Sequence, residues 1–295
     1  MKEMVILGRT VRWGDKGIEY EADPKHREMV LEYFGLDKEA KGLTHNGDKD
    51  EGKEEWEDEE LDREEAKVFR GLAARMNFLS LDCPDLQFGV KQVSREMARP
   101  TRGSWKGMKK LARYLLNREG VVWDFRYQDE QGHSYVGCDS DWGGNCKDRK
   151  STSGGMWMLG KHCVKSWSAS QGAFALSSAE AELYGMIEGV TRAKGLLSLA
   201  GEMGFQGLSN VVYVGTDSSA AKSFVCRRGL GRMRHLEIRD LWLQKEVSEG
   251  RVEVSKVLGT ENPADLMTKV LAMGEIRERL KGMGMWMKGD KGSRP

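Results

Sequence analysis

The chain has 295 residues, of which 39% are hydrophobic and 32% are charged, and its formal net charge at pH 7 is +1. This length is enough for one large or two ordinary domains, and no apolar run is long enough to predict a membrane span or signal peptide. The five cysteines form no Cys-x-x-Cys pair, which favours the cytoplasm or nucleus over a disulfide framework.

Residues 1–40 are predicted to form a β-hairpin followed by a helix. Two short apolar segments flank residues 13–17, whose glycines and aspartate favour a turn. Asp23 and Pro24 have the chemistry of an N-cap and a first helical position, and Gly35 is placed to end the helix.

Residues 41–65 have a different composition. Twelve acidic and three basic residues lie between positions 48 and 65, with almost no apolar side chains among them. Such a segment cannot bury enough surface to offset its ordering entropy, so it is predicted to be a flexible linker. The alternative is an acidic motif that binds a basic partner.

Residues 66–120 show helical periodicity interrupted by Pro84 and Pro100, which predicts three helices. Nine Lys or Arg residues and a single acid, Glu96, lie between positions 91 and 118. This imbalance fits either a solvated helix face or a surface that contacts phosphates. The candidate phosphate-contacting residues in this region are Lys106, Lys109, Lys110 and Arg113.

From residue 121 to residue 275 the pattern alternates between strands and helices, which predicts an α/β domain around one mixed sheet. We expect strands 121–125 and 134–141 to pair with each other around a polar turn. The remaining predicted elements are strands at 154–159, 164–168, 211–214 and 252–258, and helices starting near Ser177, Asp217, Leu236 and Asn262. Residues 276–295 are predicted to be a basic Gly/Lys-rich tail, frayed beyond Gly282.

Four acids occupy positions where function is expected. Asp139 lies within a strand, Glu182 in the first turns of the long helix, Asp217 at a strand-to-helix junction and Asp265 in the first turn of the last helix. Each has a structural alternative: Asp217 could be an N-cap, and Asp265 could interact with the helix dipole.

Local sequence patterns distinguish Glu182 from its neighbour Glu180, but they do not distinguish Asp139 from Asp141. Ser177 and Glu180 have the spacing of a capping box, which gives Glu180 a local role that Glu182 lacks. Asp139 and Asp141 are two residues apart, so strand periodicity places both on one face and does not distinguish them.

If these elements converge, the clustered carboxylates require cations. Carboxylate oxygens suit Mg²⁺, and two such ions about 4 Å apart suit attack of water on a phosphodiester. We therefore expect two Mg²⁺ ions, with Mn²⁺ as a substitute. A zinc site from His133, Cys138, Cys146 and His162 or Cys163 is an alternative, although its spacing fits no standard pattern.

Seven motifs in fixed order resemble the ribonuclease H domain of Ty1/copia-type retrotransposon Pol polyproteins. The resemblance covers about residues 134–271. The matching segments are 137–143, 148–154, 166–168, 175–184, 216–221, 234–239 and 262–269. Upstream, segments within 7–36 and 70–115 are similar to the region that follows the polymerase palm in those polyproteins, whereas the acidic run looks like an insertion.

The resemblance implies a ribonuclease H-like fold, with a five-stranded mixed sheet flanked by helices. It also implies an endonuclease that cuts the RNA strand of RNA–DNA hybrids, with the rest of the Pol polyprotein as a partner. The implied metal-binding acids are Asp139, Glu182, Asp217 and Asp265, which favours Asp139 over Asp141. The hybrid would also contact a second basic segment, whose candidate residues are Arg227, Arg228, Arg232, Arg234 and His235.

The sequence departs from the wider pattern in two ways. The polymerase motif Tyr-x-Asp-Asp is absent, so no polymerase activity is expected from this chain alone. Residues 258–264 lack the histidine that cellular and retroviral relatives carry before the last aspartate. The alternatives are a catalytically silent nucleic-acid-binding remnant without the polymerase core, and another nuclease of the same superfamily, such as an integrase or resolvase.

Overall fold

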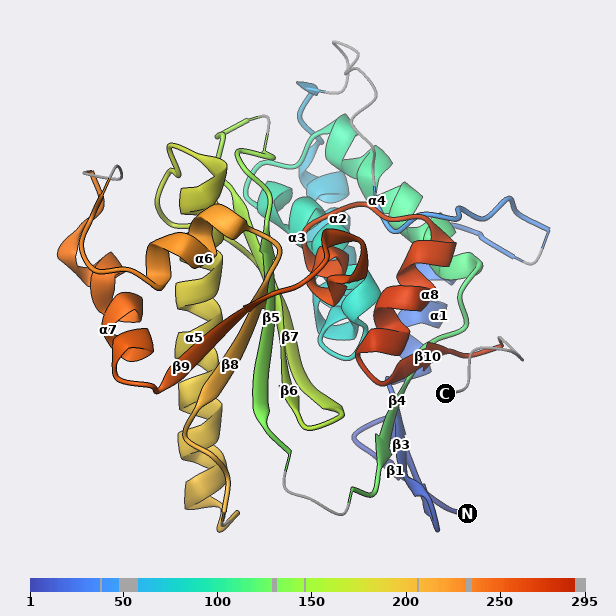
Figure 1. Ribbon diagram of the computed structural model, residues 1–295. Coiled ribbons are helices and arrows are strands. Elements are labelled where there is room, and N and C mark those ends of the chain that lie inside the picture. The colour runs from blue at the N-terminus through green and yellow to red at the C-terminus, as the bar shows by residue number, and fades with distance from the viewer. Residues whose placement is uncertain are drawn as a thin grey trace. The chain divides into compact units, whose positions relative to one another are not determined.

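The computed structural model describes residues 1–37, 39–47, 58–128, 132–145, 147–205, 207–231 and 235–289. Two compact units make up the chain (Figure 1): unit 1 comprises residues 1–127 and 269–295, and unit 2 comprises residues 128–268. Residues 48–57 of the predicted acidic linker, and the candidate residues Arg232 and Arg234, lie outside the described residues.

Unit 1 contains an antiparallel sheet with the strand order β1-β2-β3-β4-β10. Its strands are β1 (Lys2–Ile6), β2 (Arg9–Gly14), β3 (Gly17–Glu21), β4 (Val121–Arg126) and β10 (Met285–Met287). The turn predicted within residues 13–17 is confirmed as the β2–β3 hairpin, in which Gly14 pairs with Gly17. The first apolar segment instead forms β1, an additional strand at the edge of this sheet.

Two predictions about this sheet are wrong. Strand β4 does not pair with the segment at 134–141 but with β3 and β10. Residues 285–287 are not frayed, because their side chains are buried where β10 pairs with β4. Both errors have one physical cause: the partners of β4 are far from it in the sequence, so local periodicity cannot reveal them.

The helices of unit 1 are α1 (Pro24–Tyr33), α2 (Arg63–Ser80), α3 (Pro84–Ser94), α4 (Arg102–Leu116) and α8 (Met273–Gly282). Helices α1 to α4 follow the sequence pattern closely, whereas α8 falls largely within the segment 276–295 that is predicted to be a tail. Asp23 caps α1 by accepting a hydrogen bond from Lys25 N, as predicted. The prediction of a flexible linker over residues 41–65 is wrong at its C-terminal end, because Asp62 and Glu65 form a capping box that starts α2.

A buried polar network organises the interior of unit 1. Asp85 accepts hydrogen bonds from the Arg118 guanidinium and from Tyr114 Oη, the latter at 2.7 Å. Asn46 is also fully buried, and its side chain donates to Asp85 O and accepts from Leu271 N, each at 2.9 Å. The start of the predicted linker is therefore part of the packed unit.

Unit 2 contains a mixed five-stranded sheet with the order β7-β6-β5-β8-β9. Strand β5 is central: it pairs antiparallel with β6 and parallel with β8, while β8 pairs parallel with β9. The strands are β5 (Ser134–Ser140), β6 (Thr152–Leu159), β7 (His162–Ser170), β8 (Val212–Thr216) and β9 (Val252–Lys256). The prediction of a mixed α/β architecture is confirmed.

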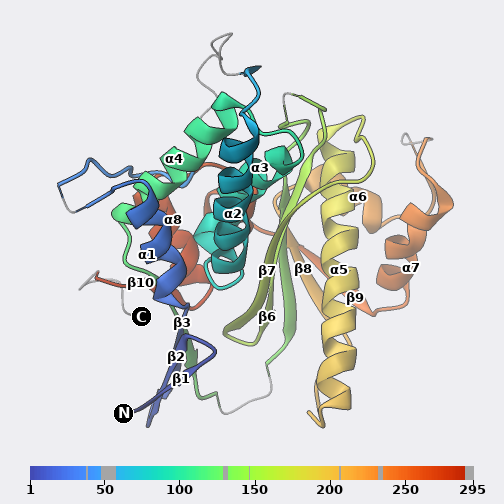
Figure 2. The ribbon, with the colours of Figure 1, turned by 180° about the vertical axis from the view of Figure 1, so that it is seen from behind.

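The long helix α5 (Ser178–Glu202) packs along the sheet of unit 2, as Figure 2 shows. Its apolar side contributes Leu183, Met186 and Val190 to a core that it shares with β5 and β8. The shorter helices α6 (Ser219–Val225) and α7 (Trp242–Ser248) complete this core. The acids of interest therefore lie on elements whose apolar sides are fixed by packing.

None of the helices formed by the described residues combines the length and apolar character that a membrane span requires.

Candidate metal centre

Asp139 lies near the end of the central strand β5 and is only 2% exposed. The hydroxyl of Thr268 donates a hydrogen bond to Asp139 Oδ2. Next to it, Asn262 Nδ2 donates to Cys138 O at 3.0 Å. These bonds attach both ends of the 3₁₀ segment η5 (Pro263–Met267) to the strand that carries Asp139.

Gly154 makes this close packing feasible. It is the register partner of Asp139 on β6. A Cβ atom at position 154 would lie 2.5 Å from Thr268 Cγ2 and 2.8 Å from Met267 Cβ. Glycine is therefore required here for close approach, which lets Thr268 reach the Asp139 carboxylate.

Glu182 and Glu180 are on the same helix but have different surroundings. Ser177 caps α5 by accepting a hydrogen bond from Glu180 N, as predicted. The Glu180 carboxylate accepts from Leu176 N and not from the N-cap backbone, so the reciprocal half of the predicted capping box is shifted by one residue. Glu182 is free of this network and accepts a hydrogen bond from Ser140 N at 3.2 Å.

Asp217 follows the last residue of β8 and precedes α6. It is not the N-cap of that helix, because Ser218 fills this role by accepting from Ala221 N at 3.1 Å. A Cβ atom at Gly259 would lie 3.1 Å from Asp217 Oδ2, so the segment at 259–261 borders this carboxylate closely. The structure therefore rules out an N-cap role for Asp217.

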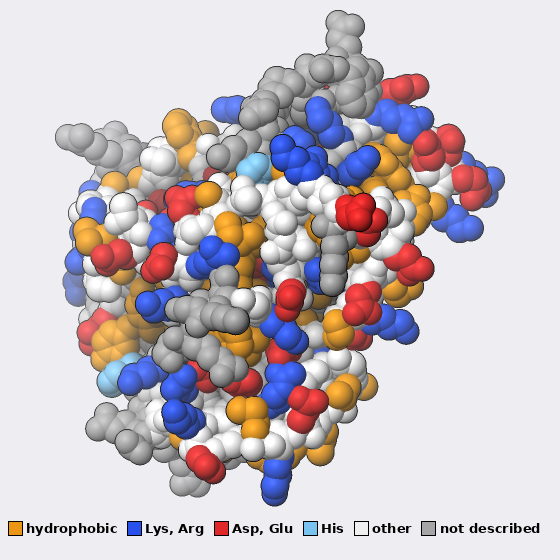
Figure 3. Space-filling model, turned by 90° about the vertical axis from the view of Figure 1, so that its right-hand side faces the viewer, with side chains coloured by type: hydrophobic (Ala, Val, Ile, Leu, Met, Phe, Trp, Pro, Cys, Tyr) orange, Lys and Arg blue, Asp and Glu red, His pale blue; other side chains and the backbone are white. Residues whose placement is uncertain are grey.

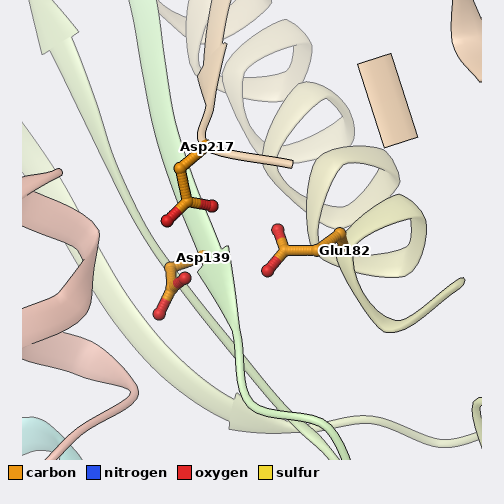
Figure 4. A group of neighbouring side chains, drawn as sticks. All are labelled: Asp139, Glu182 and Asp217. Carbon is orange, nitrogen blue, oxygen red and sulfur yellow. The ribbon is translucent and has the colours of Figure 1, made fainter. Parts of the chain in front are cut away.

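The structure brings Asp139, Glu182 and Asp217 together. One carboxylate oxygen from each lies within 4.8 Å of the others, and Figure 4 shows the three side chains pointing toward a common space. Burial, together with the charges of Asp139 and Asp217, raises the pKa of Glu182 to about 8. Within the described chain, the buried Glu182 Oε2 has no hydrogen-bond partner.

These features fit a divalent cation. Three carboxylates in a small, largely buried volume repel one another, and a bound cation would neutralise them and would supply a partner for Glu182 Oε2. We call Asp139, Glu182 and Asp217 the three-acid group. Among the described residues, it is the only group of three or more His, Cys, Asp or Glu side chains with such spacing. The alternative zinc ligands do not form such a group, and Cys146 lies outside the described residues.

The fourth predicted acid occupies a different position. Asp265 lies in the first turn of η5 and is 4% exposed, but its carboxylate is not part of the three-acid group. Asp141 lies beyond the end of β5, where its Oδ1 accepts a hydrogen bond from Thr152 N at 2.5 Å. Thr268 is not among the candidate site residues predicted from the sequence, although it lies in the same motif, 262–269, as Asp265.

The predicted phosphate-contacting residues fall in both units. In unit 1, Lys106, Lys109, Lys110 and Arg113 are on α4, where Lys109 is exposed and Arg113 Nε donates to Lys41 O at 2.8 Å. In the face drawn in Figure 3, Lys and Arg side chains are interspersed with Asp and Glu.

In unit 2, Arg227 and Arg228 are exposed, and the Arg227 guanidinium lies 5.0 Å from the centre of the Phe224 ring. His235 Nε2 lies 2.7 Å from Glu180 Oε2, so this residue is engaged within unit 2. Arg113, Arg227 and His235 therefore have intramolecular contacts that restrain their side chains.

The sequence is similar to several known proteins, although no protein-family model matches it. It is 28% identical over 207 residues to the retrovirus-related Pol polyprotein from transposon RE2 of Arabidopsis thaliana, covering 69% of this chain and 14% of that protein. It is 29% identical over 204 residues to the Pol polyprotein from transposon TNT 1-94 of Nicotiana tabacum, covering 68% of this chain and 15% of that protein.

A shorter relative is the secreted RxLR effector protein 161 of Plasmopara viticola, which is 30% identical over 125 residues, covering 41% of this chain and 85% of that protein. The chain thus spans only 14–15% of the length of the two Pol polyproteins above. It is homologous to retrovirus-related Pol polyproteins from copia-type transposons.

Proposed function

We propose that unit 2 is a divalent-metal-dependent endonuclease of the ribonuclease H type, which hydrolyses the RNA strand of RNA–DNA hybrids during retrotransposon reverse transcription. The observation that carries this proposal is the convergence of Asp139, Glu182 and Asp217 from a central strand, a helix start and a neighbouring strand end. The strand order with one mixed five-stranded sheet and the Pol polyprotein homologues support it.

In this proposal, Asp139, Glu182 and Asp217 hold the metal ions, with Asp265 as an additional acid at the edge of the site. Mg²⁺ or Mn²⁺ bound there would activate a water molecule and stabilise the leaving oxygen of the phosphodiester. The chain itself orients the ligands: Thr268 fixes Asp139, and Ser140 N fixes Glu182. Because the pKa of Glu182 is raised to about 8, this carboxyl group must lose a proton when a cation binds.

Surface charge supports the proposed substrate class. Exposed basic side chains such as Lys109 and Arg228 would neutralise backbone phosphates, which gives affinity without sequence preference. The 2′-hydroxyl groups are what allow a protein to distinguish RNA from DNA in a duplex. We propose the remaining Pol polyprotein, including its polymerase core, as the natural partner, because this chain spans a small part of its relatives.

A hybrid-cleavage assay in Mg²⁺ and in Mn²⁺ tests the function. Asp217→Asn should lower the cleavage rate by at least about 100-fold, because it removes one of three clustered metal-binding charges. Asp141→Asn is the matched control: Asp141 is a nearby acid outside the group, and asparagine can still accept the Thr152 N hydrogen bond. Equal cleavage by wild type and Asp217→Asn would contradict the metal assignment.

The second candidate function is a silent nucleic-acid-binding remnant. It is favoured by the position of Asp265 outside the three-acid group and by the absence of histidine from residues 258–264. Binding that weakens steeply with salt, with no cleavage in either metal, would support it. Preference for duplex DNA over the hybrid would instead indicate another nuclease of the same superfamily.

A further inference from the structure

Three large apolar side chains are exposed on loops that adjoin the elements carrying the three acids. Trp142, Phe174 and Leu176 have relative exposures of 58%, 57% and 66%. They lie on two loops of unit 2, one between β5 and β6 and the other between β7 and α5. Exposed aromatic side chains clustered on neighbouring loops are typical of a binding surface.

The two loops are hydrogen-bonded to each other, so the surface is preorganised. Trp142 Nε1 donates to Ala175 O at 3.0 Å, which ties the indole ring to the loop that carries Phe174 and Leu176. At the base of the first loop, Gly143 N donates to Ser151 Oγ at 3.0 Å. An anchored aromatic ring loses little conformational entropy when a ligand contacts it.

The surface is close to the metal-binding acids. Trp142 is only three residues beyond Asp139, so their Cα atoms are at most about 11 Å apart. On the other loop, Leu176 N donates to Glu180 at the start of the helix that carries Glu182. Both loops are therefore directly connected to the elements that carry the three acids.

Positive charge accompanies the aromatic rings. Lys150 Nζ lies 5.9 Å from the centre of the Phe174 ring, and Lys147 and Arg149 are exposed on the same loop as Trp142. The acids of this loop have local partners, since Asp141 accepts from Thr152 N and Asp148 from Lys150 N. Aromatic rings beside cationic side chains match the chemistry of a single nucleic acid strand, in which bases stack and phosphates pair with cations.

We propose that Trp142 and Phe174 form a stacking surface for unpaired nucleotides next to the cleavage site, so that the preferred substrate is a hybrid that continues into a single strand. Bases inside a duplex stack on each other and hide their faces, whereas unpaired bases can stack on exposed rings. This inference rests on the proposed function, because it assigns a substrate preference to the same site.

The test compares a blunt RNA–DNA hybrid with the same hybrid carrying a short single-stranded extension. Binding to the full chain is measured by fluorescence anisotropy in EDTA, and cleavage in Mg²⁺. The wild type should bind the extended hybrid about 5- to 150-fold more tightly, the range expected for stacking of one base. Trp142→Ala and Phe174→Ala should each reduce this preference, whereas Trp142→Phe should retain most of it.

Phe205→Ala is the matched control. Phe205 has the same 57% exposure as Phe174 and belongs to the same unit, but it follows the opposite end of α5. This 25-residue helix is about 37 Å long. The control variant should bind both substrates as the wild type does.

Equal affinity of the wild type for blunt and extended hybrids would overturn the stacking surface, as would an unchanged preference in both alanine variants. Cleavage of the blunt hybrid by the wild type would still support the proposed nuclease in either case. Conversely, a preference that depends on Trp142 without cleavage in either metal would retain the stacking surface and reject the nuclease. Absence of binding to either substrate would overturn both proposals.

Discussion

His235 Nε2 lies 2.7 Å from Glu180 Oε2, whereas Glu182, two residues further along α5, faces Asp139 and Asp217. Burial alone would raise the pKa of Glu180, but hydrogen bonds from His235, Tyr184 and Leu176 N hold it below its ordinary value. The pKa of Glu182 is raised instead, because burial and two carboxylates act in the same direction. One helix start therefore carries one stabilised and one destabilised carboxylate.

The contacts of Glu180 predict a structural role. Glu180→Gln should reduce the free energy of unfolding by about 1 kcal/mol at pH 7, because glutamine weakens the charge-assisted hydrogen bonds. A lowered pKa means that the charged form stabilises the fold above pH 4.5 and that this contribution is lost as the pH falls below it. Urea unfolding at pH 4 and pH 7 measures the effect.

His235→Ala is the companion variant for this prediction. It removes only one partner of Glu180, and the His235 side chain is 42% exposed, so its effect should be smaller than that of Glu180→Gln. A larger loss of stability in His235→Ala than in Glu180→Gln would contradict the role assigned to Glu180.

The raised pKa of Glu182 predicts that the stability of the metal-free protein has the opposite pH dependence. A carboxyl group with a pKa raised to about 8 binds its proton more tightly in the folded state, so stability should fall as the pH rises from 4.5 to 8. The loss should be on the order of 4 kcal/mol. Glu182→Gln should remove this decline, and Mg²⁺ should reduce it. Urea unfolding in EDTA between pH 5 and pH 8.5 checks the result, and an identical decline in Glu182→Gln would contradict it.

Local chemistry made much of the fold predictable. Asp23 with Pro24, and Ser177 with its following apolar face, mark the starts of α1 and α5 because capping and periodicity act over a few residues. The partners of β4 were not predictable, because strand pairing depends on contacts such as the β10 side chains, more than 150 residues away. Likewise, Asp62 starts α2 inside an acidic run that composition alone assigns to a linker.

The candidate site was predictable to a similar degree. Asp139, Glu182 and Asp217 stand at a strand end, a helix start and a strand-to-helix junction, which is where the topology can bring acids together. The separation of Asp265 from this group, and the hydrogen bond from Thr268 to Asp139, depend on how η5 packs against the sheet. No local pattern specifies that packing.

Thr268 should matter to activity through Asp139. Thr268→Val keeps the side-chain shape but removes the donor to Asp139 Oδ2, so we expect a roughly 10-fold lower cleavage rate and a weaker apparent affinity for Mg²⁺. Thr268→Ser retains the hydroxyl and should behave nearly as the wild type. Rates measured against Mg²⁺ concentration separate the two effects. Equal Mg²⁺ dependence in the valine and serine variants would contradict an orienting role.

Gly154 and Gly195 provide a paired test of packing at the site. Gly154→Ala should destabilise the protein by about 1–3 kcal/mol, because the added Cβ would overlap Thr268 and Met267. Gly195 lies within α5, and no described atom outside the local helix backbone comes within 4 Å of its Cβ position, so Gly195→Ala should stabilise by about 0.5–1 kcal/mol. Urea unfolding of both variants measures whether the free energy of unfolding falls in Gly154→Ala and rises in Gly195→Ala. If Gly154→Ala were as stable as the wild type and as active, the close packing of η5 on β6 would not be what holds Thr268 against Asp139.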